Sequence, residues 1–146
     1  LVMTNGYQEP DVRARAVAKV KTHPDYQGEL IRILQTGYAS EAFQFLASNE
    51  VDDPKRFPEA VLVGIAKQTE AFHEIINSTN STSDFYPEIF QSESENVIKT
   101  SEKFKGMGVD FKPSIIELRK TIDGQPDIER PKLKSMQILD EWIKRN

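Results

Sequence analysis

Apolar residues recur every three or four positions in several segments of the chain, and this spacing predicts α-helices. The longest such segment covers residues 58–77, and Pro58 suits its first position. Its predicted buried side consists of Val61, Leu62, Ile65, Ala66, Phe72 and Ile76. An earlier helix is predicted over residues 10–21, where Val12, Ala16 and Val20 recur every four residues with Val17 beside them. His23-Pro24 ends it, because the residue before a proline is driven out of the helical region.

The remaining helices are shorter. They are predicted at residues 25–34 with Gly37 as the cap, at 40–47, from Tyr86-Pro87, at 96–105, at 113–122 and from Pro131 onward. Their predicted buried residues are Leu30, Ile31, Ile33, Leu34, Ala42, Phe43, Phe45, Leu46, Val97, Ile98, Phe104, Ile115, Ile116, Leu118, Ile122, Leu133, Met136, Leu139, Trp142 and Ile143. Only Val109-Asp110-Phe111 alternates as a strand does, and it is too short to found a sheet. The pattern therefore predicts an all-α fold.

A chain of 146 residues fits one domain with a single core. Short helices with short connections bury their apolar stripes on each other as antiparallel hairpins. Residues 77–84 read NSTNSTSD and predict a polar, flexible loop between two halves. The chain starts Leu1-Val2-Met3 with no signal peptide, so we expect it to be a piece of a longer protein.

Residues 9–20, Glu-Pro-Asp-Val-Arg-Ala-Arg-Ala-Val-Ala-Lys-Val, resemble the second helix of a HEAT-type repeat. The shared features are the Asp, the Val-Arg pair and small residues before an aliphatic end. The resemblance covers residues 9–48, weakens through residue 76, and is absent beyond Ser78. It implies a HEAT-like stack of hairpins in the first half, with irregular helices after it. Such stacks present extended surfaces to protein partners.

Charge and composition exclude several partners. The net charge is −4, split as −7 over residues 1–95 and +3 over residues 96–146, which is too weak a basic region to predict nucleic-acid binding. No run approaches the roughly 18 apolar residues of a membrane span. The absence of cysteine removes disulfides, zinc–thiolate sites and iron–sulfur clusters. The compartment stays open, with the cytoplasm favoured.

No catalytic or metal-binding pattern emerges. The only histidines are His23 and His73, and neither lies at a metal-ligand spacing with the other. No serine occupies a nucleophile elbow, and no glycine loop follows a strand. The carboxylates Glu50, Asp52 and Asp53 lack the spacing of a calcium loop and predict a solvated turn. We expect no cofactor, no metal and no enzymatic activity.

Two sets of residues are candidates for binding a protein partner. Phe85, Tyr86, Ile89 and Phe90 follow the polar loop, where they either dock into a partner or pin the loop onto the core. The second set is an apolar strip on the first helix, formed by Val12, Val17 and Val20 with Leu1-Val2. The sequence thus favours a non-catalytic interaction or scaffold module that binds a protein or another domain of its parent chain. The alternative is a helical bundle that binds a ligand or cofactor in a pocket near His73.

Overall fold

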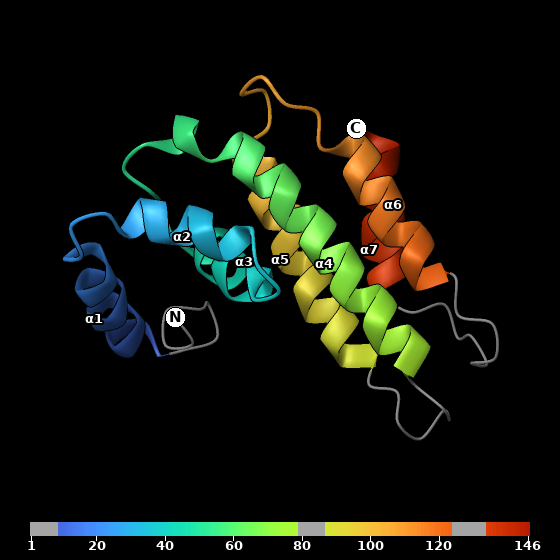
Figure 1. The fold of residues 1–146 in the computed structure, drawn as a ribbon, viewed down its shortest axis with the longest axis horizontal. Coiled ribbons are helices and arrows are strands. Elements are labelled where there is room, and N and C mark those ends of the chain that lie inside the picture. The colour runs from blue at the N-terminus through green and yellow to red at the C-terminus, as the bar shows by residue number, and fades with distance from the viewer. Residues whose placement is uncertain (1–8, 79–86, 124–133) are drawn as a thin grey trace.

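A computed structural model of the chain describes residues 9–78, 87–123 and 134–146 (Figure 1). These residues form seven α-helices, one 3-10 turn and no strand. The elements are α1 (Pro10–Lys21), α2 (Tyr26–Leu34), α3 (Ala39–Ser48), η2 (Pro54–Arg56), α4 (Pro58–Ser78), α5 (Pro87–Lys103), α6 (Lys112–Asp123) and α7 (Lys134–Arg145). The predicted all-α class is confirmed. Within the same ranges, no helix has both the length and the apolar character needed to cross a membrane.

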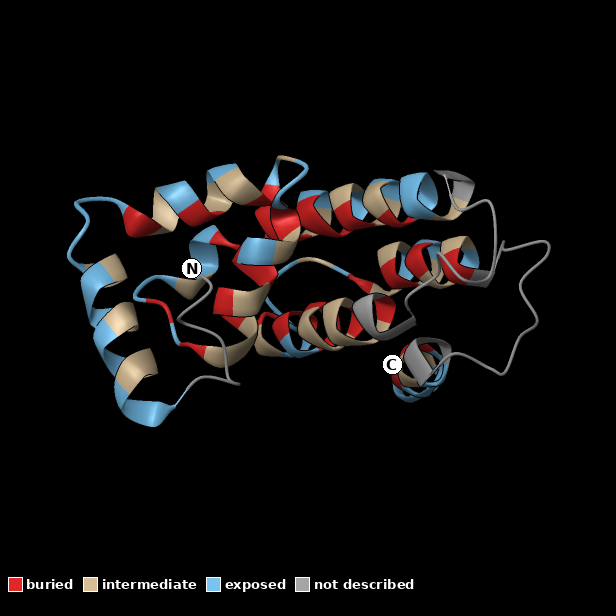
Figure 2. Cartoon of the chain, turned by 90° about the horizontal axis from the view of Figure 1, so that it is seen from below, coloured by how far each residue is buried: buried red, intermediate tan, exposed pale blue. Residues whose placement is uncertain are grey.

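From α2 to α7 the helices alternate between two layers (Figures 1 and 2). In one layer α4 packs between α2 and α6, and in the other α5 packs between α3 and α7. The consecutive helices α2 and α3, α4 and α5, and α6 and α7 also contact each other, so they form three stacked hairpins. The alternation continues to α7, so the C-terminal half is packed in the same way as the first half, where the sequence predicted irregular helices.

One hydrophobic core runs through both layers, from Tyr26 in α2 to Trp142 in α7. Phenylalanine rings join the elements within it: Phe57 stacks on Phe104 with their centroids 5.5 Å apart, and Phe72 meets Phe90 edge to face at 4.6 Å. Such pairs add specificity of geometry to the burial of large apolar areas.

Gly64 allows the first two hairpins to approach closely. It is buried in the middle of α4, and a Cβ atom there would lie 2.7 Å from Cδ2 of Leu34 in α2 and 3.1 Å from Cζ of Phe43 in α3. A side chain at this position would therefore force Leu34, Phe43 or α4 itself to shift.

Three sequence-based details were wrong. Residues 87–103 form one continuous helix, α5, and not two; Ser94 in its polar middle is fully buried against neighbouring helices, so tertiary packing holds the segment helical. Gly37 does not end α2 in a left-handed conformation, since the helix ends at Leu34 and only Gly106 and Gly108 have positive φ among the described residues. Ala66 is exposed.

Candidate functional site

Helix α1 differs from the other helices in how it packs. Pro10 occupies its first turn, and the chain leaves it at Thr22 before the turn at Pro24. None of its residues is buried, and it makes no extensive contact with any other described helix. Only Val17 and Val20 reach the core, from its edge. In Figures 1 and 2 it lies at one end of the stack, set apart from both layers.

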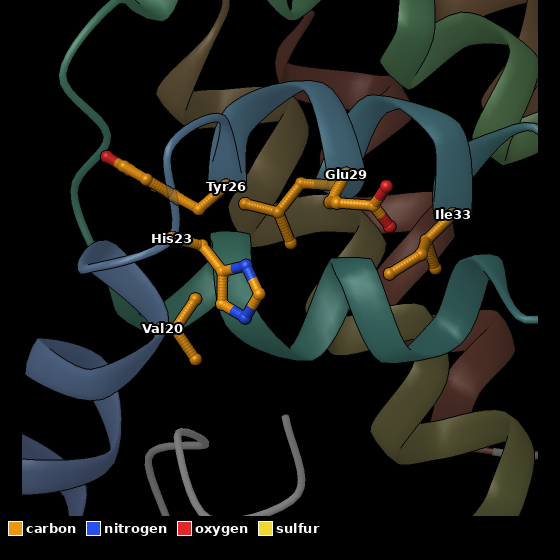
Figure 3. Close-up of a pocket in the computed structure, with 6 residues that line it drawn as sticks. Val20, His23, Tyr26, Glu29 and Ile33 are labelled. Atoms are coloured by element: carbon orange, nitrogen blue, oxygen red, sulfur yellow. The ribbon is translucent and has the colours of Figure 1, made fainter.

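A first hollow lies at the elbow between α1 and α2 (Figure 3). We call it the elbow pocket. Its volume is about 310 Å³, and it is lined by Val20, His23, Tyr26, Glu29, Leu30 and Ile33. The carboxylate of Glu29 already accepts two hydrogen bonds from Arg32, at 3.2 and 3.0 Å. One polar group of the pocket is therefore already bonded within α2. The aliphatic part of the lining consists of Val20, Leu30 and Ile33.

A second, larger hollow of about 550 Å³ separates α1 from the end of α3. We call it the α1 groove. Its described lining residues are Pro10, Arg13, Ala14, Val17, Ala18 and Lys21, with Asn49 on the other side. The six α1 residues recur at steps of three and four, so they form one face of the helix. Ala14 and Ala18 are exposed, and Val17 is half-buried between them. The groove thus has a small apolar floor with a cation toward each end.

The cations of α1 that line the groove form no ion pair with the described residues, whereas Arg15 on another side of the helix donates to the backbone carbonyl of Asp11 at 3.3 Å. Within the described part of the chain neither Arg13 nor Lys21 forms an ion pair, whereas Arg32, Arg56 and Arg119 each pair with a carboxylate. Residues 10–21 carry a net charge of +3, from four basic residues and Asp11. All other residues together carry −7, which gives the net charge of −4 for the chain. Helix α1 is a basic element on an acidic protein.

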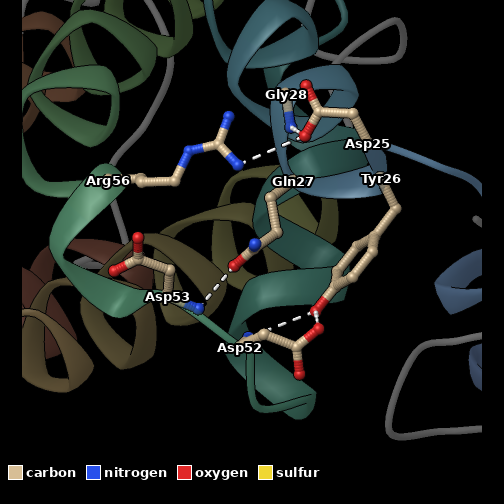
Figure 4. A network of polar contacts seen from close by, with 7 residues as sticks. All are labelled: Asp25, Tyr26, Gln27, Gly28, Asp52, Asp53 and Arg56. Atoms are coloured by element: carbon tan, nitrogen blue, oxygen red, sulfur yellow. Dashed lines mark hydrogen bonds and ion pairs between the residues drawn. The ribbon is translucent and has the colours of Figure 1, made fainter.

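Polar contacts hold the α2–α3 hairpin beside α1 in place (Figure 4). The Tyr26 hydroxyl donates to Oδ2 of Asp52 at 2.9 Å, and burial raises the pKa of Tyr26. The amide of Asp53 donates to Oε1 of Gln27 at 2.7 Å. Asp25 accepts from the amide of Gly28 and from Arg56, and these two donors lower its pKa. The acidic loop is thus tied to the start of α2.

This loop has the exposed side chains that the sequence predicted. Glu50, Asp52 and Asp53 are all exposed, and among the described residues no group of three potential ligands is arranged to hold a metal ion.

A polar pair between α4 and α5 was missed by sequence reasoning. Gln68 is buried, and its Nε2 donates to Oε2 of Glu93 at 2.6 Å. Burial raises the pKa of Glu93 to about 7, against the opposing effect of this hydrogen bond. Beside it, the hydroxyl of Ser94 is buried and has no hydrogen-bond partner among the described residues. The helical spacing of Gln68 with Ile65 and Phe72 was the only signal in the sequence for this position.

The aromatic candidates divide into three groups. Phe85 and Tyr86 lie outside the described residues, as do Leu1 and Val2, and Ile89 belongs to α5 without a described side chain. Phe90 is 1% exposed and packs on Phe72, which fits the interpretation that it anchors its segment to the core. His73, beside the pocket suggested as an alternative, is exposed.

The α1 candidates are half-buried. Val12, Val17 and Val20 are intermediate in exposure, and only Val17 lines the α1 groove. Arg13, Ala14, Ala18 and Lys21 were missed as a surface. Their helical spacing is present in the sequence, but the prediction was based on the valines of the adjacent helix face.

Comparison of the chain with protein-family models, with curated proteins and with solved structures finds no match in any of the three. The resemblance of residues 9–20 to a HEAT-type repeat therefore stays a prediction.

Proposed function

We propose that this chain is a non-catalytic protein-interaction module and that its binding surface is the α1 groove. One observation carries the proposal: α1 buries none of its residues although it has half-buried valines and exposed alanines facing a hollow of about 550 Å³. Helices in small domains owe most of their stability to packing of an apolar face. A helix that leaves such a face open gains that packing when a partner covers it.

The architecture supports the same reading by analogy. Stacked helical hairpins build rigid, extended frames whose edges and faces bind other proteins. This support is at the level of fold, so the site must carry the functional argument. A ligand-binding bundle centred on His73 has no comparable support, because that side chain lies exposed on α4.

Site-specific photocrosslinking tests the proposal. A photoreactive residue at Ala18, which is exposed in the groove, is compared with one at Lys144, which is exposed on α7. In extracts of the cells that produce the protein, we expect one defined adduct from position 18 and none from position 144. The captured protein is then purified and its affinity for the whole chain measured by calorimetry.

Bulky variants provide the matched control. Ala14→Trp fills the groove, whereas Lys19→Trp adds the same ring to an exposed position outside the groove lining on the same helix. We expect Ala14→Trp to weaken binding of the purified partner at least about tenfold and Lys19→Trp to leave it within about twofold. Equal adducts at positions 18 and 144, or equal effects of the two tryptophans, would refute the proposed surface.

A further inference from the structure

The two cations of the α1 groove are too far apart to bind one small anion together. Arg13 and Lys21 are eight residues apart on one helix, which places their backbones about 12 Å apart along its axis. A phosphate or a single carboxylate can reach one of them but cannot bridge both. A ligand that contacts both cations must therefore extend over about two helical turns.

The floor between the cations is suited to a helix. Ala14 and Ala18 are four residues apart, exposed, and small. Small side chains let a second helix approach closely, because the distance between packed helices is set by the side chains at the contact. Val17 beside them offers apolar surface for the partner's aliphatic residues.

The described residue that lines the opposite side of the groove, Asn49, is uncharged. Asn49 follows the end of α3, where the backbone carbonyls of a helix carry partial negative charge. There Nζ of Lys103 donates to the carbonyl oxygens of Leu46 and Asn49, at 2.7 and 2.8 Å. The negative end of α3 is thus already compensated from α5, and the charged side chains among the described lining residues of the groove are Arg13 and Lys21.

We propose that the α1 groove binds an amphipathic, acidic helix of a protein partner, with two carboxylates about two turns apart that pair with Arg13 and Lys21. This inference rests on the proposed function and names the class of partner. Aliphatic residues between the carboxylates pack on Ala14, Val17 and Ala18. A flat anionic membrane fits less well, because Arg13 and Lys21 are half-buried in the lining of a hollow, while Arg15 and Lys19 are the exposed cations of α1.

The test uses the whole chain and a synthetic helical peptide of about 16 residues with capped ends. The peptide carries two glutamates eight positions apart with leucine and alanine between them, and a fluorophore for anisotropy. A control peptide has both glutamates replaced by glutamine. We expect the acidic peptide to bind at least about tenfold more tightly than the control at low salt, with the difference shrinking as salt rises.

Paired charge reversals locate the site. Arg13→Glu with Lys21→Glu is compared with Arg15→Glu with Lys19→Glu, which makes the same change of net charge on the same helix outside the groove lining. We expect the first pair to weaken the acidic peptide at least about tenfold and the second pair about twofold or less. A peptide with lysines in place of the glutamates should bind the first variant pair in preference to the unmodified chain. Circular dichroism should show that both variant pairs stay folded, since none of these cations is ion-paired within the described residues, and both pairs replace one cation of the last turn of α1.

Three outcomes would overturn the inference. Equal binding of the acidic and control peptides would remove the role of charge. Binding to phosphatidylserine vesicles that both variant pairs weaken equally would indicate a membrane surface. A concentration-dependent dimer in sedimentation, lost in the groove variant pair, would indicate a second copy of this chain as the occupant. In each case a defined crosslink at Ala18 to a purified protein partner would leave the proposed function standing, and its absence would remove both.

Discussion

The Nζ atom of Lys103 in α5 lies 2.7 Å from the carbonyl oxygen of Leu46, in the last turn of α3. The same ammonium group reaches the carbonyl of Asn49 at 2.8 Å and lies 3.5 Å from a carboxylate oxygen of Glu50. A side chain from the second hairpin thereby caps a helix of the first. The α3–α5 contact is therefore held by directed charge-assisted bonds as well as by apolar packing.

We predict that Lys103→Met lowers the free energy of unfolding by about 2 kcal/mol, because it leaves two partly buried carbonyl groups without a donor. Methionine keeps the length and apolar stem of the side chain. The control is Lys99→Met, one turn earlier on an exposed position of α5. Urea denaturation measures both, and equal values for the two variants would show that the cap contributes nothing.

Glu93 is expected to make stability depend on pH. Its pKa is raised from 4.5 to about 7, so the native state favours the protonated form. Its stabilising contribution is thus fully present below pH 4.5 and is lost as the pH rises through about 7. We therefore predict that this group lowers the free energy of unfolding by about 2–3 kcal/mol as the pH rises from 5 to 8.

Glu93→Gln isolates this effect, since glutamine keeps an acceptor oxygen for Gln68 and cannot ionise. We expect the variant to be more stable than the unmodified chain at about pH 8, with a flatter profile toward pH 5. Glu59→Gln, on an exposed position of α4, is the control. Chemical denaturation across this pH range checks the prediction, and parallel profiles for all three proteins would contradict it.

Gly64→Ala should destabilise the fold although alanine is the better helix former. The added methyl group would meet Leu34 and Phe43 at 2.7 and 3.1 Å, and overpacking of this kind costs about 1–3 kcal/mol. The gain in helix propensity, about 1 kcal/mol, offsets only part of it. The comparison is Gly37→Ala, where no atom lies within 4 Å of the new methyl group. Thermal melting should separate the two variants, and an unchanged or raised melting temperature for Gly64→Ala would show that α4 can shift at no cost.

Trp142 should report on docking of the last helix. The residue is 2% exposed, and its Nε1 donates to Oε1 of Glu102 in α5 at 2.6 Å. We expect blue-shifted native fluorescence that moves to the red on denaturation. Trp142→Ala should cost about 3–5 kcal/mol. Trp142→Phe keeps most of the apolar area and should cost less. Native emission at the wavelength of a fully solvated indole would mean that α7 is not docked.

Local signals in the sequence were sufficient for most of the helices. Pro10 and the His23-Pro24 turn gave α1 its observed bounds, and Pro58 gave α4 its start. The sequence predicted two helices in place of the long α5, because residues 91–95 in its middle are all polar. Ser94 is nevertheless buried, because it packs against other helices. Local patterns carry no information about such contacts.

The candidate site was less accessible to sequence reasoning for the same reason. The amphipathic pattern of α1 is that of a packed helix, with Val12, Ala16 and Val20 in register. What sets α1 apart is that none of the other described helices packs closely on it, which depends on how the turn at His23 and Pro24 directs the chain. The sequence alone does not indicate that Arg13 and Lys21 line a hollow, because the hollow depends on how α1 packs.

The position of α1 outside both layers also affects its hydrogen exchange. Amide hydrogens in a helix that buries none of its residues exchange through local opening, at a small free energy, whereas those in the middle of α4 wait for global unfolding. The two helices should therefore report two levels of protection within one molecule. A partner that covers the groove should raise the protection of α1 toward that of α4. Part of its binding free energy then opposes the local opening of α1. Slowed exchange confined to residues 10–21 would then map the bound state without any crystal of the complex.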